Sequence, residues 1–210
     1  MTLHPVILPV VQETNRRTGP VKLQAQRRAA RSALHLCAQF CQVRLGDLQK
    51  DEREAPLPFD GIYWSLTHKP HYAAAVLAAE PVGIDIEAVQ PRSAGLFAYV
   101  ATPPEWQCAG IDPVVIEALF AGEITMPDDV LWHIFFRYWT AKEAALKAVG
   151  IGIAHLKRCR IIEVLDETHL RIDYYDRHWL IAHSAQDGHL AAITQNNQPL
   201  EWHWHTQQNP

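Results

Sequence analysis

The sequence predicts an α+β protein of two similar halves, each with a long helix packed on an antiparallel sheet. Two long segments, 22–45 and 128–149, carry apolar residues at helical spacing. Short β-type runs separated by turn residues lie between and after them. The stretches 64–78 and 179–194 also resemble each other: both place Trp four residues before a His, with a second His opening an Ala-rich run. This echo favours two halves related by a pseudo-twofold axis, although two hairpins in any α+β protein could match by chance.

The N-terminal half contains the first long helix and its following loop. Leu34 and Cys41 belong to the apolar stripe of the segment 22–45, and Gly46 offers a stop. The charged, proline-bearing segment 47–61 is expected to be a loop.

Strands are expected next. The run IYWSLTHKPHYAAAVLA, 62–78, predicts two strands around a turn at Lys69-Pro70, and GIDIE, 83–87, predicts another short strand. Short helices are expected within 101–125.

The second long helix, 128–149, has acids in its first turn and Gly150 just beyond its end. Four β-type runs follow, at 160–167, 169–176, 179–186 and 189–194. We place the halves at 1–81 and 82–210, with a site at their junction.

Composition excludes some classes of partner. The 210 residues are 48% apolar and 20% charged, which is ordinary for a soluble globular chain. The net charge of −4 gives no general basic field for nucleic acid. The apolar N-terminus has no basic start, and no run approaches the ~20 residues that span a bilayer. We therefore expect no membrane or nucleic-acid partner.

Cysteine and histidine usage is also informative. The four cysteines are scattered without metal-type CxxC pairs, so free thiols in a reducing cytoplasm are expected. His203 and His205 in EWHWH could bind a metal adventitiously, but a C-terminal strand with a polar face explains them better.

GIDIE carries two acids at alternate positions. Because strand side chains alternate, Asp85 and Glu87 point to one side and Ile84 and Ile86 to the other. Either water or a cation must screen two like charges held in this way.

The second long helix contains WTAKEAALK, 139–147, in which Lys142, Glu143 and Lys147 lie within an arc of roughly 140°. Glu143 and Lys147 could be an ordinary i,i+4 ion pair. If the helix instead began at Thr140, Thr140 and Glu143 could form a capping box. However, the helix is apolar on most sides, and ionisable groups buried among aromatic residues require partners or a function.

Together these residues suggest a metal site for phosphate chemistry. Asp85, Glu87 and Glu143 are the hard oxygen ligands that Mg²⁺ takes, often with substrate phosphate completing its shell. Lys142 and Lys147 would neutralise phosphate oxygens. This set fits phosphoryl-type transfer through positioning and electrostatic stabilisation.

The two motifs resemble the paired signature of the 4′-phosphopantetheinyl transferases, G-x-D-x-E followed by W-x-x-K-E-A-x-x-K. Here they lie about 50 residues apart. The chain length resembles the Sfp-type branch of the family, whose members are monomers with two pseudo-symmetric α+β halves. The resemblance implies transfer of the phosphopantetheine arm of coenzyme A to a serine of a carrier protein, with Mg²⁺ and with release of 3′,5′-ADP. It covers about residues 22–150.

By this resemblance, Asp85, Glu87 and Glu143 are metal ligands. Glu143, or a metal-bound water, is the base for the carrier serine. Lys142 and Lys147 contact phosphate and pantetheine, so the catalytic residues are Glu143, Lys142 and Asp85.

The resemblance assigns three further residues, each with an ordinary structural alternative. His68 in SLTHKP would contact a coenzyme A phosphate, or be a satisfied core or turn histidine. Arg31 would grip the adenosine 3′-phosphate, or lie on a solvated helix face. Glu105 in TPPEW resembles a family acid, or is an ordinary helix N-terminal acid.

The sequence departs from the family at three positions. The G-K-P turn is replaced by Glu54-Ala55-Pro56, Thr67 stands where Ser is usual, and Ala101 replaces an aromatic residue. The first change removes a lysine contact to the nucleotide, so coenzyme A affinity is expected to be weaker or differently distributed.

Two rival functions remain at this stage: a non-catalytic protein that binds a carrier or nucleotide, and a Mg²⁺ hydrolase of another diphosphate. Fatty-acid, polyketide and nonribosomal-peptide carriers all fit as the acceptor. Because this chain is net negative, docking of an acidic carrier would need a local basic or apolar patch.

Overall fold

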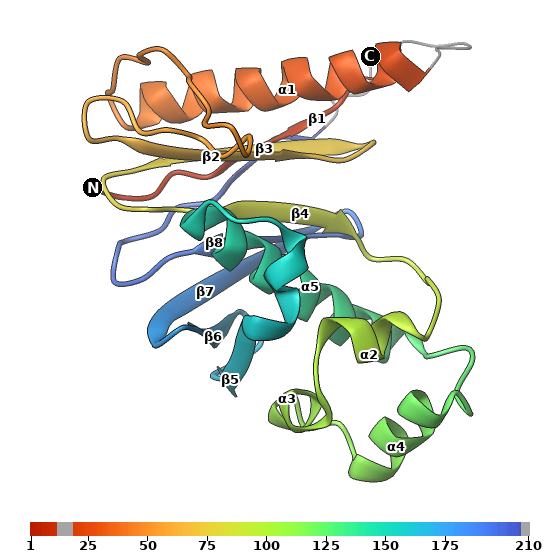
Figure 1. Cartoon of the computed structure of the whole chain (residues 1–210). Helices are drawn as coiled ribbons and strands as arrows, with labels where there is room; N and C mark the ends of the chain where they lie inside the picture. Colours follow the sequence, from red (N-terminus) through yellow and green to blue (C-terminus); the bar gives the residue numbers. More distant parts are fainter. Residues whose placement is uncertain (12–18, 207–210) are drawn as a thin grey trace.

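The computed structural model describes residues 1–11 and 19–206. Two sheets lie face to face between two long helices, α1 (Gly19–Phe40) and α5 (Asp129–Val149), as Figure 1 shows. The mixed helices and largely antiparallel sheets confirm the predicted α+β class.

The first sheet has the order β2-β3-β1-β9. Its strands are β1 (Val6–Pro9), β2 (Tyr63–His68), β3 (Tyr72–Ala78) and β9 (His203–Trp204). β9 pairs in parallel with β1, and the other pairs are antiparallel. The segment that forms β9 therefore pairs with the first strand of the N-terminal half, and the division at residue 81 remains a prediction.

The second sheet has the order β4-β8-β7-β6-β5, and all its pairs are antiparallel. Its strands are β4 (Ile84–Ala88), β5 (Arg160–Val164), β6 (His169–Tyr174), β7 (Arg177–Gln186) and β8 (His189–Thr194). All the strands expected after the second long helix are present, within one to three residues of their predicted bounds.

Side-chain alternation separates three apolar layers. In β3, Ala75 and Leu77 pack toward α1, whereas Ala74 and Val76 pack toward the second sheet. A third cluster lies between the second sheet and α5 and is rich in aromatic residues. The small alanine side chains of β3 let neighbouring elements pack closely on both of its faces, which suits a strand buried on both sides.

The two halves share a connection order. In each, a strand precedes the long helix, and the second strand of a later hairpin pairs with that first strand. The histidines of the sequence echo are not equivalent, however. His68 faces Ala73 beside its turn, whereas His183 faces Ala192, well before the Gln186–His189 turn. A common origin of the halves remains a prediction.

The helix ends follow local rules. Asp128 caps α5 by accepting a hydrogen bond from the Leu131 N–H, and Gly150 ends the helix in the left-handed conformation, with φ of 74°. α1 ends at Phe40, earlier than predicted, because Gln42 adopts a left-handed φ of 55° before Gly46 is reached.

Three short helices and a 3₁₀ turn complete the C-terminal half. They are α2 (Leu96–Val100), α3 (Pro103–Cys108), α4 (Pro113–Ala121) and η1 (Ile153–Arg158). α3 and α4 fall within the predicted helical segment 101–125, whereas α2 lies wholly before it and was not predicted. None of the described helices is long and apolar enough to cross a membrane.

Candidate active site

β4 presents its two acids toward α5. Ile84 and Ile86 belong to the apolar cluster between the sheets, whereas Asp85 and Glu87 point the other way. Both acids are buried, with exposures of 2% and 8%. The alternation predicted from GIDIE is thus present, and the question is what compensates the charges.

Gly83 allows α5 to lie directly against the start of β4. A Cβ atom at this position would fall 1.9 Å from the carbonyl oxygen of Ala144 and 2.7 Å from the amide nitrogen of Ala148. Only glycine permits this approach. The close packing brings the turn of α5 that holds Glu143 and Lys147 beside Asp85.

Asp85 has partners on one carboxylate oxygen alone. Its Oδ1 accepts hydrogen bonds from Thr67 Oγ1 at 2.9 Å and from Lys147 Nζ at 2.8 Å. Its Oδ2 is buried and accepts no hydrogen bond from the described residues. A buried carboxylate oxygen without a donor costs free energy, and a cation bound at Asp85 Oδ2 would offset that cost.

Glu87 and Glu143 lie in the same electrostatic field. Burial, with Asp85 nearby, raises the pKa of both Glu87 and Glu143 above their ordinary value. Lys69 forms an ion pair with Glu87 at 2.5 Å. The pKa of Lys69 is raised, because the charges of Asp85, Glu87 and Glu143 outweigh the opposing effect of its burial.

These features fit a divalent cation. Three carboxylates share the charge of two lysines, and one buried oxygen lacks a donor. In this structure Asp85 contacts Lys147 and Glu87 contacts Lys69, and the oxygens of Asp85, Glu87 and Glu143 do not all lie within 4.8 Å of one another. The donor set is nevertheless the all-oxygen type that Mg²⁺ selects.

A cationic rim surrounds the acids. His68 is half-buried, and its Nδ1 lies 3.2 Å from Gln26 Oε1 on α1. Its pKa is lowered by burial first and then by the charges of Arg27, Lys147 and Lys69. Two elements of the N-terminal half, α1 and the β2–β3 turn, therefore bring positive charge to acids of the C-terminal half.

Arg31 lies one turn beyond Arg27 on α1, and its side chain is exposed. It is Arg27 whose charge acts on His68. The predicted contact of Arg31 with the adenosine phosphate remains a prediction.

Lys142 does not join the carboxylates of β4. Its side chain is fully buried, and its Nζ donates to Glu105 Oε1 at 2.6 Å and to the Val100 carbonyl at 2.7 Å. Lys142 is 100° from Glu143 around the helix, whereas Lys147 is only 40° from it. The predicted arc therefore spans two faces of a helix that is buried on both, and Lys142 pairs with Glu105 rather than with the acids of β4. Its predicted contact with phosphate remains a prediction.

Glu105 organises the region around Lys142. Its Oε2 accepts from the amide and hydroxyl of Thr102, and its Oε1 also accepts from the Ile161 amide at 2.9 Å. Burial lowers the pKa of Lys142, against the opposing charge of Glu105. The helix-terminal role considered for Glu105 is present, together with an ion pair that the sequence did not reveal.

A pocket lies beside the acids where α5 ends. It has a volume of about 190 Å³ and is lined by the loop after α1, by β2 and by the segment from Lys147 to Gly152. Lys50, Arg53 and Lys147 supply its positive charge. Glu54-Ala55-Pro56 forms part of the wall, so the altered turn still borders a basic cavity.

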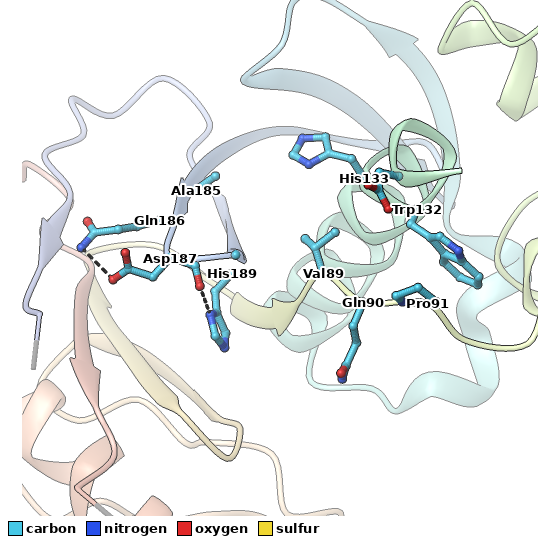
Figure 2. Close-up of a pocket in the computed structure, with 11 residues that line it drawn as sticks. Val89, Gln90, Pro91, Trp132, His133, Ala185, Gln186, Asp187 and His189 are labelled. Carbon is cyan, nitrogen blue, oxygen red and sulfur yellow. Dashed lines mark hydrogen bonds between the residues drawn. The ribbon is translucent and has the colours of Figure 1, made fainter. Parts of the chain in front are cut away.

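A second, larger pocket of about 580 Å³ lies at the opposite end of α5, and Figure 2 shows its lining. Val89, Gln90 and Pro91 lead into it from β4, Trp132 and His133 come from the start of α5, and the β7–β8 turn closes the other side. Val89 is two residues beyond Glu87, so the acids lie between the two pockets.

The comparisons with known proteins identify the family. The family model for the 4′-phosphopantetheinyl transferase superfamily matches residues 81–209. The chain belongs to this superfamily. The match includes both sequence motifs and the whole second sheet, which confirms the resemblance seen in GIDIE and WTAKEAALK.

A curated relative supports the same family. The chain is 35% identical over 104 residues to the 4′-phosphopantetheinyl transferase HetI of Nostoc sp. (strain PCC 7120 / SAG 25.82 / UTEX 2576). The match covers 48% of this chain and 38% of that protein. The chain therefore spans well under half of the relative's length in this match.

Sequence reasoning missed several residues of the site. Lys69 was noted only as part of a turn, and Thr67 only as a departure from a motif. Lys50 and Arg53 were read as ordinary loop residues. The signal for Lys69 was its place next to His68, whereas the contact of Thr67 with Asp85 depends on how the edge strands of the two sheets meet.

Proposed function

We propose that this protein transfers the 4′-phosphopantetheine group of coenzyme A to a serine of a carrier protein in a Mg²⁺-dependent reaction. The observation that carries the proposal is the unpartnered Asp85 Oδ2, buried beside Glu87 and Glu143 and flanked by Lys69 and Lys147. Membership of the superfamily and the similarity to HetI support the activity.

Asp85, Glu87 and Glu143 would hold the Mg²⁺ ion. When bound, the ion supplies positive charge to the pyrophosphate of coenzyme A. Lys69 and Lys147, released from their ion pairs with Glu87 and Asp85, would then donate to phosphate oxygens as point charges. His68 and Arg27 extend this cationic surface toward the nucleotide end.

In the reaction, the serine Oγ forms a bond to the β-phosphorus of coenzyme A, and the bond from that phosphorus to the bridging oxygen breaks. The leaving group is 3′,5′-ADP, and the serine proton goes to a base. Glu143, to which the family resemblance assigns this role, would accept the proton.

The nucleotide end of coenzyme A fits the smaller pocket. Lys50 and Arg53 lie there with Lys147, and would replace the lysine missing from the Glu54-Ala55-Pro56 turn. The larger pocket at the start of α5 would receive the acceptor segment of the carrier, because its lining begins at Val89, two residues beyond Glu87.

Lys142 has a positioning role in this proposal. Its ion pair with Glu105 links α5 to α3, and the Ile161 amide adds the start of β5 to the same carboxylate. The network fixes the rotation of α5, and with it the direction of Glu143.

We infer that the reaction takes place in the cytoplasm, in a monomer. The four cysteines are free, and Cys37 and Cys159 are buried thiols, as suits a reducing compartment. The halves at 1–81 and 82–210 would each contribute to the site, the first through cations and the second through carboxylates.

Intact-mass measurement tests the proposal. The full chain is incubated with an apo carrier protein, coenzyme A and Mg²⁺, with carriers from fatty-acid, polyketide and nonribosomal-peptide systems in parallel. A carrier should gain the mass of one phosphopantetheine group, and the gain should disappear with excess EDTA. Release of 3′,5′-ADP without a carrier would indicate a hydrolase, and carrier binding without any mass gain would indicate a binding protein.

A further inference from the structure

The two ends of the described chain meet at a cluster of metal-binding side chains. His4 precedes β1, and Glu201 and His203 lie on the segment that forms β9. A parallel ladder joins the two strands, pairing Val6 with His203, and the His203 amide donates to the Pro5 carbonyl at 2.9 Å. The positions of these side chains are thus set by the backbone of the first sheet.

One nitrogen of each histidine lies close to the other and to the carboxylate of Glu201, whose two oxygens face one histidine each. His4 Nδ1 lies 3.0 Å from His203 Nε2 and 3.6 Å from Glu201 Oε2. His203 Nε2 lies 3.9 Å from Glu201 Oε1. Within residues 1–11 and 19–206, this is the set of three such groups whose ligand atoms all lie within 4.8 Å of one another.

Hydrogen bonding explains one of these contacts at most. A proton shared between His4 Nδ1 and His203 Nε2 accounts for the 3.0 Å separation. The carboxylate of Glu201 is then too far from either nitrogen for a hydrogen bond. The same two nitrogens nevertheless face both each other and the carboxylate, as they would around a shared cation.

The separations match a tetrahedral zinc site. Zinc bonds of about 2.0–2.1 Å at the tetrahedral angle place neighbouring ligand atoms roughly 3.3–3.4 Å apart. The observed range of 3.0–3.9 Å spans that value. Two imidazoles and one carboxylate form a donor set that zinc accepts, with the fourth position left to water.

The surroundings hold the imidazoles in place and leave one side open. The side chains of His4 and His203 are only 16% and 15% exposed, whereas that of Glu201 is 64% exposed. The ring of Phe40, at the end of α1, stacks on His203 with centroids 3.9 Å apart and planes 16° apart. The two nitrogen ligands are therefore pre-positioned, and an ion can enter past the carboxylate.

We propose that His4, Glu201 and His203 form a Zn²⁺ site that fastens the last strand of the chain to the first. Binding would close a loop that includes nearly the whole polypeptide, so the ion would stabilise the attachment of β9 to β1. The site shares no residue with the carboxylates around Asp85, so the proposal does not depend on the proposed transferase activity.

The test uses ZnCl₂ as the only added transition-metal salt, with tag-free full chain in a buffer that contains excess Mg²⁺. Competition with a chromophoric zinc chelator measures affinity and stoichiometry for the parent and for the variants Glu201→Gln and His203→Gln. His205→Gln is the matched control, because His205 is exposed and lies two residues beyond His203 outside the cluster. Thermal unfolding with and without ZnCl₂ gives a second readout.

The parent and His205→Gln should bind one Zn²⁺ more than the two cluster variants. Loss of one ligand should weaken binding at this site at least about 100-fold, beyond the ~10–100-fold effect of outer partners. At about 100 times its Kd, Zn²⁺ should raise the Tm of the parent by roughly 5–10 °C, but not that of Glu201→Gln. Because the Glu201 side chain is exposed, that variant is expected to fold.

Two results would overturn the proposal. Equal zinc stoichiometry in the parent, Glu201→Gln and His203→Gln would mean that the cluster is only a hydrogen-bonded histidine pair. An equal loss of zinc in His205→Gln would mean that binding is a general property of the histidine-rich end of the chain.

Discussion

Replacement of Lys142 separates a positioning role from direct contact with coenzyme A. Lys142→Met keeps the length and packing of the side chain but removes the charge. The variant leaves Glu105 Oε1 with only the Ile161 amide as a donor, and leaves the Val100 carbonyl without its Lys142 donor. Because the pair is buried, breaking it should lower the free energy of unfolding by about 3–5 kcal/mol.

The double variant Lys142→Met/Glu105→Leu removes both charges. No uncompensated buried charge then remains, so part of the lost stability should return, although the amides of Thr102 and Ile161 lose Glu105 as their acceptor. Denaturant unfolding of the parent, the single variants and the double variant gives the coupling energy of the pair. The same four proteins are assayed for phosphopantetheine transfer at varied coenzyme A.

If Lys142 acts by positioning α5, the KM for coenzyme A should follow stability through this series, so the double variant should regain part of both. The reasoning would be refuted if Lys142→Met lost less than about 1 kcal/mol of stability while KM rose strongly. It would also be refuted if the double variant were stable but kept the raised KM.

Three further predictions concern the rest of the site. Gly83→Ala should lower the free energy of unfolding by about 3 kcal/mol, because its Cβ would overlap the α5 backbone at Ala144. The control Gly95→Ala, with 3.8 Å of clearance, should change the free energy of unfolding by under about 1 kcal/mol. Denaturant unfolding checks both variants, and equal effects would contradict the close-packing argument. Lys50→Ala combined with Arg53→Ala should raise the KM for coenzyme A about tenfold with little change in kcat, and an unchanged KM would exclude the smaller pocket as the nucleotide site. Because the pKa of Glu143 is raised, the folded protein binds a proton at Glu143 more tightly than the unfolded chain does. Without Mg²⁺, stability should therefore fall as pH rises from the ordinary glutamate range through the raised pKa. Glu143→Gln should flatten this slope in thermal unfolding measured across pH, and an unchanged slope would contradict the raised pKa of Glu143.

Local rules predicted the parts of the site that depend on one element. The period of a strand put Asp85 and Glu87 on one side, and the period of a helix put Lys147 close to Glu143. The end of the helix at Gly150 likewise depends on neighbouring residues and is present, whereas Asp128, expected in the first turn, caps the helix instead. These are patterns that a sequence displays directly.

Contacts between distant elements could not be predicted in this way. Lys142 was assigned to phosphate, yet its partner Glu105 lies 37 residues earlier on another helix. Which face of a largely buried helix meets which neighbour depends on the packing of α3, α5 and β5 together. The parallel pairing of β9 with β1 likewise joins the two ends of the chain, where no local pattern connects His4 with His203.

The central claim is that Asp85 holds the Mg²⁺ ion used in transfer. The Mg²⁺ dependence of transfer by Asp85→Asn tests it most directly. The change keeps the shape of the side chain but removes the charge of Asp85, whose buried Oδ2 accepts no hydrogen bond from the described residues. Glu80→Gln, at an exposed carboxylate before β4, is the control. If Asp85 holds the ion, intact-mass assays should show transfer reduced at least about 100-fold, with normal transfer by the control. Transfer by Asp85→Asn at the parental rate and with the parental Mg²⁺ requirement would contradict the account.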